Sequence, residues 1–338
     1  MDRVLELKDF NVTYKNKTKK VYAVKDINLT INKGDSLGIV GESGSGKSTL
    51  AMAILRLLPE RNTEITGSSN FANKDLVQAS EKELKEIRWK ELSVVFQKSM
   101  NALSPVHRIG EQIEDIYRVH KPNARKEEIF DRIKALLRLV NLSERVFKMY
   151  PHELSGGMLQ RVAIAISLIH DPKLLIMDEA TTALDVVTQG QILEEIVKME
   201  QTLDVTRIMI THDISVVATT CNKIAVLYAG ELMEVGYVKD ILKEPKHPYT
   251  KGLLSSIPSL SGEKETLTGI KGHLPDLSQK YEGCIFAPRC EHAMEQCGKS
   301  KPSETQLTGE NRVWCHLYSQ SDRGEQLDIS KNLAEVNR

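Results

Sequence analysis

The sequence predicts an α/β fold built around a parallel β-sheet. Short, almost wholly apolar segments recur along the chain, at residues 36–40, 174–177, 207–210 and 224–228. Runs of this kind are typical of strands buried on both faces of a parallel sheet. Helix-like segments separate them, and a glycine-rich loop directly follows the first one. Strands that alternate with helices in this way indicate the α/β class.

Other segments read as strands or helices in chain order. Residues 4–7, 11–14 and 27–31 are strand-like, the last because apolar and polar residues alternate. Residues 48–58 predict a helix that a proline ends. Residues 123–140 predict an amphipathic helix whose apolar stripe packs on a core.

The composition is that of an ordinary soluble protein. The chain has 338 residues, and 46 Lys and Arg balance 46 Asp and Glu. A neutral balance argues against general binding to a nucleic-acid backbone, which needs a basic face. No apolar run approaches the roughly 20 residues of a membrane helix, and the charged start has no apolar signal region. We therefore expect a reducing compartment.

A phosphate-binding loop is predicted at residues 41–49, GESGSGKST, which fit the pattern G-x-x-x-x-G-K-[ST]. Glycines let the backbone N–H groups wrap around phosphates, Lys47 would reach the β- and γ-phosphates, and the Ser48 hydroxyl would ligate Mg²⁺. The N-terminus of the following helix adds a favourable field for the anion. The predicted nucleotide contacts are Gly41, Ser43, Gly44, Ser45, Gly46, Lys47, Ser48 and Thr49.

An acidic pair follows the apolar strand at 174–177. Asp178 would reach the carboxyl edge of the sheet, where the phosphate loop also opens, and could hold Mg²⁺. Glu179 is placed to polarise an attacking water as a general base. Alone the pair could equally be structural. Together with the loop it strongly indicates a phosphate site with Mg²⁺ and a general base.

Over most of residues 14–230 the sequence resembles the ATP-binding cassette (ABC) ATPases. The deciding stretch is LSGGM at 154–158, just before the acidic strand, where that family carries LSGGQ. The phosphate loop, Gln97, this signature, the acidic pair, Asp185 and His212 follow one another in the family's order. The resemblance implies the fold of a P-loop NTPase.

The resemblance also implies a role for each matching residue. Tyr14 would stack on adenine, although Tyr22 could compete for that place. Gln97 would contact Mg²⁺ and the attacking water. His212 would hold the γ-phosphate and steady Glu179, so the catalytic set is Glu179, His212 and Gln97.

The signature implies a dimer. Ser155, Gly156 and Gly157 would contact the γ-phosphate of a nucleotide held by the opposite subunit, and Asp185 would lie at the dimer seam. A Ser-Gly-Gly turn that opens a helix is a second anion site, and one phosphate group cannot easily use two such sites within one chain. A simple helix cap is the alternative for this turn. Met158 replaces the family's Gln, but Ser155 and Gly157 supply the anion contacts.

Further stretches resemble the oligopeptide/dipeptide/nickel importer branch, to about residue 318. The signature methionine is familiar in that branch, whereas Lys98 and Ser99 replace its usual Asp-Pro and put the local permease contact in doubt. The matching stretches are 100–113, 228–234, EPKHPYT at 244–250, LPDL at 274–277, and 283–290.

The branch implies an energy-coupling ATPase bound peripherally at the cytoplasmic face of a cell membrane. Its expected partners are a second ABC ATPase subunit, favoured as a paralogous partner in a heterodimer, and two permease subunits docked through the segment between Gln97 and Leu154. An extracytoplasmic substrate-binding protein would take part indirectly, and nucleic acid would not. Oligopeptides or dipeptides are the expected cargo, with nickel or oligosaccharide as alternatives. A soluble ABC ATPase of DNA repair or translation is a remote alternative.

Four of the five cysteines gather in the last fifth of the chain. Their spacing matches neither the Cys-x2-Cys of a zinc ribbon nor the ferredoxin run. Four thiolates suit a [4Fe–4S] cluster or tetrahedral Zn²⁺, and some peptide-importer ATPases of this type carry a [4Fe–4S] cluster. We expect iron–sulfur, with zinc or free thiols as alternatives, on Cys284, Cys290, Cys297 and Cys315.

The expected organisation has three parts. Residues 1–258 would form the ABC nucleotide-binding domain, with an N-terminal antiparallel β subdomain and a helical subdomain at about 98–165. Residues 259–320 would form a small metal-binding extension, and 321–338 a polar tail.

Overall fold

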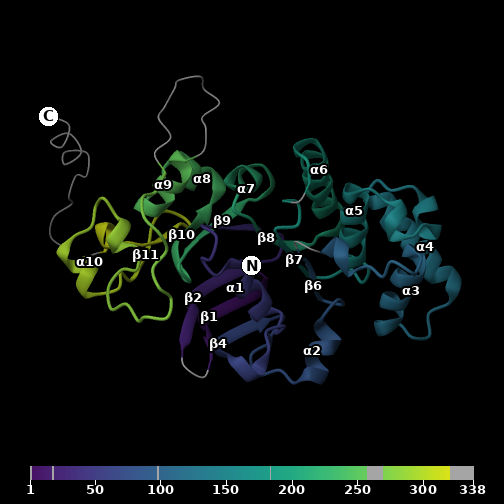
Figure 1. Ribbon diagram of the computed structural model, residues 1–338, viewed down its shortest axis with the longest axis horizontal. Coiled ribbons are helices and arrows are strands. Elements are labelled where there is room, and N and C mark those ends of the chain that lie inside the picture. The colour runs from purple at the N-terminus through teal and green to yellow at the C-terminus, as the bar shows by residue number, and fades with distance from the viewer. Residues whose placement is uncertain (1, 17–18, 97–98, 183, 257–268, 320–338) are drawn as a thin grey trace.

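The structure, a computed structural model, describes residues 2–16, 19–96, 99–182, 184–256 and 269–319 (Figure 1). Its central sheet has eight strands in these residues, in the order β11-β12-β10-β9-β3-β8-β7-β6. The strands from β9 to β6 are parallel, and those from β9 to β11 are antiparallel. The strand bounds are β3 (Ser36–Val40), β6 (Leu92–Val95), β7 (Leu174–Asp178), β8 (Thr206–Ile210), β9 (Lys223–Tyr228), β10 (Glu231–Tyr237), β11 (Glu304–Gln306) and β12 (Arg312–Trp314).

The four apolar segments of the sequence are β3, β7, β8 and β9, so the predicted parallel core is confirmed. Successive side chains of a strand point to opposite faces, and both faces of this sheet are covered. In β7, Leu174 and Ile176 enter the core that also contains α1. Leu175 and Met177 enter the core formed with α5 and α6.

A second, antiparallel sheet covers one face of the first and has the order β2-β1-β4-β5. Its strands are β1 (Arg3–Lys15), β2 (Lys20–Asn32), β4 (Thr63–Phe71) and β5 (Lys74–Asp75). The prediction of two separate strands at 4–7 and 11–14 was wrong. They form one strand, because register shifts and a positive φ of 44° at Asp9 absorb the break between them.

The helices lie around these sheets, and α3, α4 and α5 form a group at the right of Figure 1. The predicted helix at 123–140 is α4, and the one at 48–58 is the shorter α1. The bounds are α1 (Lys47–Ile54), α2 (Glu81–Ile87), α3 (Ile109–His120), α4 (Lys126–Leu139), α5 (Gly156–Ser167), α6 (Val186–Leu203), α7 (Ile214–Thr220), α8 (Val238–Lys243), α9 (Pro248–Ser255) and α10 (Glu295–Lys299). Among the described residues, no helix is both long and apolar enough to span a bilayer.

The C-terminal region continues the central sheet. β12 pairs with β10 and β11 pairs with β12, so a hairpin from this region forms the sheet's edge. Phe286, which is buried, packs against Tyr228 of β9 and Tyr249 of α9, with ring centroids 5.2 Å and 5.3 Å away. The region therefore shares a hydrophobic core with β9 and with Val40, the last residue of β3 before the phosphate loop. The predicted tail, 321–338, lies outside the described residues.

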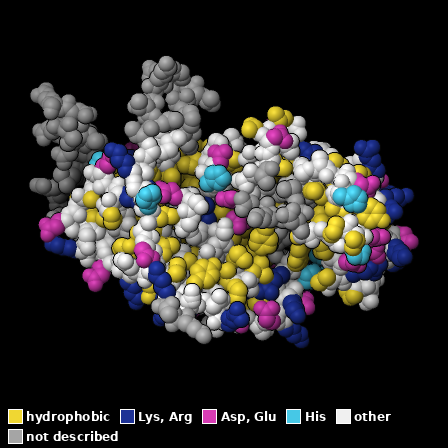
Figure 2. All heavy atoms as spheres, in the orientation of Figure 1, with side chains coloured by type: hydrophobic (Ala, Val, Ile, Leu, Met, Phe, Trp, Pro, Cys, Tyr) yellow, Lys and Arg dark blue, Asp and Glu magenta, His cyan; other side chains and the backbone are white. Residues whose placement is uncertain are grey.

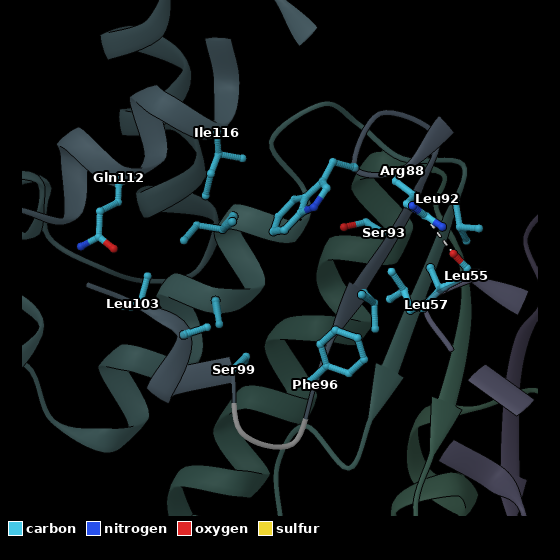
Figure 3. A pocket seen from close by; sticks show the side chains of 15 residues that line it. Leu55, Leu57, Arg88, Leu92, Ser93, Phe96, Ser99, Leu103, Gln112 and Ile116 are labelled. Carbon is cyan, nitrogen blue, oxygen red and sulfur yellow. Dashed lines mark hydrogen bonds between the residues drawn. The ribbon is translucent and has the colours of Figure 1, made fainter. Parts of the chain in front are cut away.

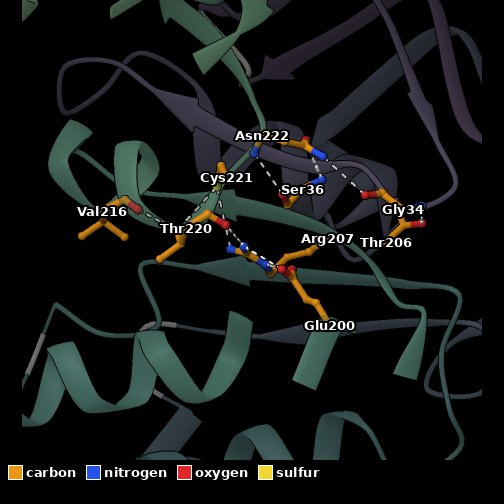
Figure 4. A network of polar contacts seen from close by, with 9 residues as sticks. All are labelled: Gly34, Ser36, Glu200, Thr206, Arg207, Val216, Thr220, Cys221 and Asn222. Atoms are coloured by element: carbon orange, nitrogen blue, oxygen red, sulfur yellow. Dashed lines mark hydrogen bonds and ion pairs between the residues drawn. The ribbon is translucent and has the colours of Figure 1, made fainter. Parts of the chain in front are cut away.

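A buried arginine ties two helices to β8 (Figure 4). The side chain of Arg207 is fully buried and bonds both carboxylate oxygens of Glu200 in α6. It also donates to the carbonyl of Thr220, at the end of α7, and to Cys221 Sγ at 3.8 Å. A buried charge is tolerated only when it is paired in this way. Cys221 is thus a half-buried packing residue.

Candidate nucleotide-binding site

The phosphate loop connects β3 to α1, as the sequence predicts. Gly41 has a φ of 154°, and a Cβ on it would lie 2.0 Å from the carbonyl oxygen of Leu227. Gly46 caps α1 with a φ of 99°, and a Cβ there would lie 2.4 Å from the carbonyl oxygen of Ala23. Only glycine fits these positions, so the motif's glycines are needed for the loop to pack between β2 and β9.

Lys47 is buried at the first position of α1. Its Nζ donates to the carbonyl oxygens of Gly41 and Glu42 at 2.8 Å and 2.9 Å, so the ammonium group lies inside the loop. Burial lowers the pKa of Lys47, while the nearby carboxylates of Glu179 and Asp178 oppose this shift. The loop thus holds a desolvated cation where the sequence predicts phosphate.

The structure brings the two predicted Mg²⁺ ligands together. Ser48 Oγ donates to Asp178 Oδ1 at 3.0 Å, across 130 positions of sequence. Burial raises the pKa of Asp178, and the hydrogen bond from Ser48 acts in the opposite direction. Oxygen donors of this kind suit Mg²⁺, which takes few protein ligands and the rest from water and substrate phosphates. The residues present therefore fit the predicted ion.

Glu179 and His212 also lie together. Glu179 follows β7 in the left-handed region, with a φ of 47°, and its N–H donates to the carbonyl of Ile210 at 2.9 Å. His212 follows β8, and its Nδ1 is 3.4 Å from Glu179 Oε1. The carboxyl ends of two adjacent parallel strands thus place a carboxylate and an imidazole side by side.

Tyr14 lies beside the loop, with its hydroxyl 3.3 Å from Thr49 Oγ1. Its ring packs partly against the core under α1, and Tyr22 lies on the neighbouring strand β2. Gln97 lies outside the described residues, so its predicted contacts have no structural counterpart here.

The signature residues line a hollow of about 380 Å³, separate from the phosphate loop. Ser155 caps α5 by accepting a hydrogen bond from the N–H of Met158 at 3.3 Å. Asp185 caps α6 by accepting one from the N–H of Thr188 at 3.0 Å, and this bond lowers the pKa of Asp185. The lining residues are Ser155, Gly156, Gly157, Met158, Arg161, Leu184, Asp185, Thr188 and Gln191.

The phosphate loop and the signature hollow are built on different elements of the chain. α1 packs on β1, β2 and β7, whereas α5 packs on β6, α4 and α6. Figure 1 shows α1 over the sheets and α5 in the helical group beside them. One chain therefore presents the phosphate loop and the signature at two separate places, which we call half-sites in anticipation of the proposal below.

An apolar pocket of about 410 Å³ lies between β6 and the helical group (Figure 3). Trp89 and Leu57 line it and are 37% and 38% exposed. Leu103 and Ile116 contribute from the segment between Gln97 and Leu154 that the sequence assigns to permease docking. On the face shown in Figure 2, hydrophobic side chains reach the surface near the middle of the molecule.

The four C-terminal cysteines do not form the predicted metal site in this structure. Within the described ranges, the structure contains no group of three or more His, Cys, Asp or Glu side chains that could hold a metal ion. Burial raises the pKa of Cys284 and of Cys315 to about 11 each. Cys297 is held by its backbone, which accepts from the N–H of Cys284 at 2.8 Å. The expectation of an iron–sulfur or zinc centre is therefore not supported here.

Sequence reasoning missed three residues that touch the phosphate loop from the C-terminal region. Arg289 pairs with Glu42, the Tyr249 hydroxyl accepts from the Glu42 N–H, and Leu274 lies against Gly44. Arg289 and Glu42 are 247 positions apart, so no local pattern signals the contact.

The fold and the two half-sites define an ATPase of the ABC class. Residues 24–182 match the family described as "ABC transporter", and residues 233–297 match "Oligopeptide/dipeptide transporter, C-terminal region". A dimeric post-hydrolysis structure of the ATP-binding cassette MJ0796 bound to ADP and Pi is similar, with a TM-score of 0.61 and 31% identity, covering 69% of this chain and 98% of that one.

Curated relatives extend the similarity over nearly the whole chain. The oligopeptide transport ATP-binding protein OppD of Escherichia coli (strain K12) is 44% identical, over 92% of this chain and 93% of its own. The dipeptide transport ATP-binding protein DppD of Bacillus subtilis (strain 168) is 41% identical, over 95% of this chain and 96% of its own. The chain belongs to the family of oligopeptide/dipeptide ABC importer ATP-binding subunits, and it couples ATP hydrolysis to transport.

Proposed function

We propose that this chain energises the import of oligopeptides or dipeptides from the cytoplasmic face of the membrane. The carrying observation is that one chain joins a complete set of cassette motifs to the C-terminal region typical of these transporters. Relatives named for oligopeptide and for dipeptide transport are similarly close, at 44% and 41% identity. Nickel and oligosaccharide are the competing cargoes, because the cassette itself does not contact cargo.

Uptake by cells tests the cargo. A strain that lacks this chain is complemented with the wild-type protein or with Glu179→Gln, and the uptake of labelled di-, tri- and pentapeptides, ⁶³Ni²⁺ and a labelled oligosaccharide is measured. We expect only peptide uptake to depend on the wild-type chain. Loss of nickel or oligosaccharide uptake, with peptide uptake intact, would contradict the proposal.

For hydrolysis, we propose that Lys47 binds the β- and γ-phosphates and that Glu179 removes a proton from the attacking water. The contact of His212 with Glu179 supports a role for the imidazole in orienting this carboxylate. Mg²⁺, held by Ser48 and Asp178, would neutralise charge on the phosphates. Gln97 is proposed to contact the same ion and water, and Tyr14 to stack on adenine.

We further propose that two ATPase subunits close head to tail, so that Ser155, Gly156 and Gly157 of one face the nucleotide of the other. The separation of the two half-sites within one chain supports this arrangement. The exposure of Val186 and Val187, 84% and 70%, beside the signature hollow also supports a covered surface there.

The favoured partner is a paralogous ATPase rather than a second copy. Mass photometry of purified Glu179→Gln protein with ATP tests this choice, with and without the paralogue. We expect dimers only with the paralogue, and abundant dimers of this chain alone would contradict it.

Two permease subunits are proposed to dock at the apolar pocket beside β6, and a substrate-binding protein to act through them.

A metal at the four cysteines also stays a proposal, supported only by their donor chemistry. Anaerobic purification with iron and zinc analysis tests it. About four irons per chain would support a [4Fe–4S] cluster. Stoichiometric zinc would support the alternative zinc site, and the absence of both metals would contradict a metal site at these cysteines.

A further inference from the structure

Glu42, the second residue of the phosphate loop, is held at two points by the C-terminal part of the chain. Its backbone N–H donates to the hydroxyl of Tyr249 in α9 at 3.0 Å. Its side-chain Oε2 is 2.9 Å from Nη1 of Arg289, which directly precedes Cys290. The family pattern leaves position 42 open, since any residue fits there, so nothing in the motif accounts for these contacts.

The side chain of Arg289 is buried and held by several hydrogen bonds. Its side chain is 7% exposed, and its guanidinium group also bonds acceptors other than Glu42. Nε and Nη2 donate to the carbonyls of Lys271 and Ile270 at 2.8 Å and 3.1 Å, and Nη1 also donates to the hydroxyl of Tyr228 at 3.3 Å. The guanidinium group lies over the Tyr228 ring, 5.6 Å from its centroid. Planar arginine satisfies several acceptors at once in a way that lysine cannot.

The charges explain what this contact can do. The Glu42 carboxylate is close enough to Lys47 to influence its ionisation, and the Lys47 ammonium donates to the Glu42 carbonyl. An unpaired carboxylate here would repel the triphosphate that the loop binds. Arg289 neutralises it with a hydrogen-bonded charge, the strong kind of pair, in a partly desolvated setting where charges interact strongly.

We propose that Arg289 is a positioning residue for ATP binding. It fixes Glu42 and cancels its charge, so that the phosphate loop receives the nucleotide without electrostatic opposition. The C-terminal region thereby acts on the affinity of the site for ATP, in addition to its part in the sheet and core. The inference rests on the ATPase activity of the family and not on the identity of the cargo.

Steady-state ATPase assays and direct binding of a fluorescent ATP analogue, on the complete transporter, test the proposal. We expect Arg289→Gln to raise the KM for ATP and the analogue's Kd by about ten-fold, with kcat changed by less than about two-fold. The defect is expected to grow as salt is lowered, because screening of the Glu42 charge weakens. Arg289→Lys keeps the charge but loses the planar set of donors. Its KM for ATP should lie between those of the wild-type and Arg289→Gln proteins.

The double variant Glu42→Gln/Arg289→Gln separates charge from packing. It removes the unpaired carboxylate, so its KM should return toward the wild-type value, which a purely structural role of Arg289 would not produce. Arg312→Gln is the matched control, because Arg312 pairs with Glu304 within the hairpin, at 3.3 Å, and its KM should equal the wild-type value. An unchanged KM in folded Arg289→Gln protein, or a raised KM that Glu42→Gln does not relieve, would overturn the proposal. If Arg289→Gln fails to fold, Arg289→Lys replaces it in both measurements. Its KM for ATP should then be raised, and Glu42→Gln should relieve the increase.

Discussion

At the scale of single residues, the site depends on side chains placed where two parallel strands end. Glu179 leaves β7 with a left-handed backbone, a conformation that non-glycine residues rarely adopt. Such conformations persist where the surroundings hold them, and they cluster at functional sites. Here the N–H of Glu179 is fixed to Ile210 and its carboxylate lies beside His212. The backbone thus places one carboxylate beside His212 and close enough to Lys47 to influence its ionisation.

The variant Glu179→Gln should bind ATP but lower kcat by about 100- to 10,000-fold, because the amide keeps the shape and cannot accept the proton. ATPase assays and nucleotide-binding titrations on the same preparation measure both effects. Lys47→Ala serves as the comparison, since it should weaken ATP binding itself. Near-normal hydrolysis by Glu179→Gln would remove the general-base assignment.

At the scale of elements, α9 shows how the HPYT stretch is used. His247 is 1% exposed, and its Nδ1 accepts a hydrogen bond from the N–H of Tyr249 at 3.0 Å, which caps the helix. Its backbone N–H donates to Glu234 of β10 at 2.9 Å. Burial lowers the pKa of His247 to about 3. The imidazole is therefore neutral in the folded protein, as its role as acceptor requires.

This histidine predicts a pH dependence of stability. The unfolded chain takes up a proton on His247 below about pH 6.5, whereas the folded one resists protonation down to about pH 3. Stability should therefore fall with decreasing pH in this window, by up to about 1.4 kcal/mol per pH unit from this group. His247→Asn, a cap that does not titrate, should reduce that slope in urea unfolding at pH 5 and pH 7. Glu234, whose pKa burial raises, contributes with the opposite sign in both proteins. Equal slopes would contradict the prediction.

At the scale of the whole molecule, the activity is divided between surfaces. The phosphate loop lies over the sheets, the signature hollow belongs to the helical group, and an apolar pocket separates β6 from that group. The C-terminal hairpin completes the central sheet at its far edge. This division fits the proposal that partner subunits complete the nucleotide site and cover the apolar pocket.

The pocket predicts a separable defect. Leu57→Glu places a charge at its rim, where the wild-type side chain is 38% exposed, so it should spare folding but weaken association with the permeases. We expect less of the chain to co-purify with the membrane subunits, by about ten-fold, with nucleotide binding unchanged. Leu317→Glu is the control, because Leu317 is 41% exposed, lies outside the segment between Gln97 and Leu154 and does not line this pocket. Equal co-purification of the two variants would contradict the docking proposal.

Much of the fold was predictable because its signals are local. β3 was predicted with its observed bounds, and β7, β8 and β9 each within one residue, since strands buried on both faces are apolar throughout. β4 was missed because its sequence, TEITGSSNF, is mostly polar, and its partner β1 rather than its own pattern makes it a strand.

The sequence by itself determined the chemistry of this protein. A glycine-rich loop, the acidic pair and the Ser-Gly-Gly turn are short motifs, and short motifs depend on neighbouring residues alone. Only the tertiary structure decided which distant groups meet. It joined Ser48 to Asp178, kept the signature apart from the phosphate loop, and brought Arg289 onto Glu42. The physical reason is that such contacts follow from strand order and from the packing of three cores, in which residues far apart in the chain become neighbours.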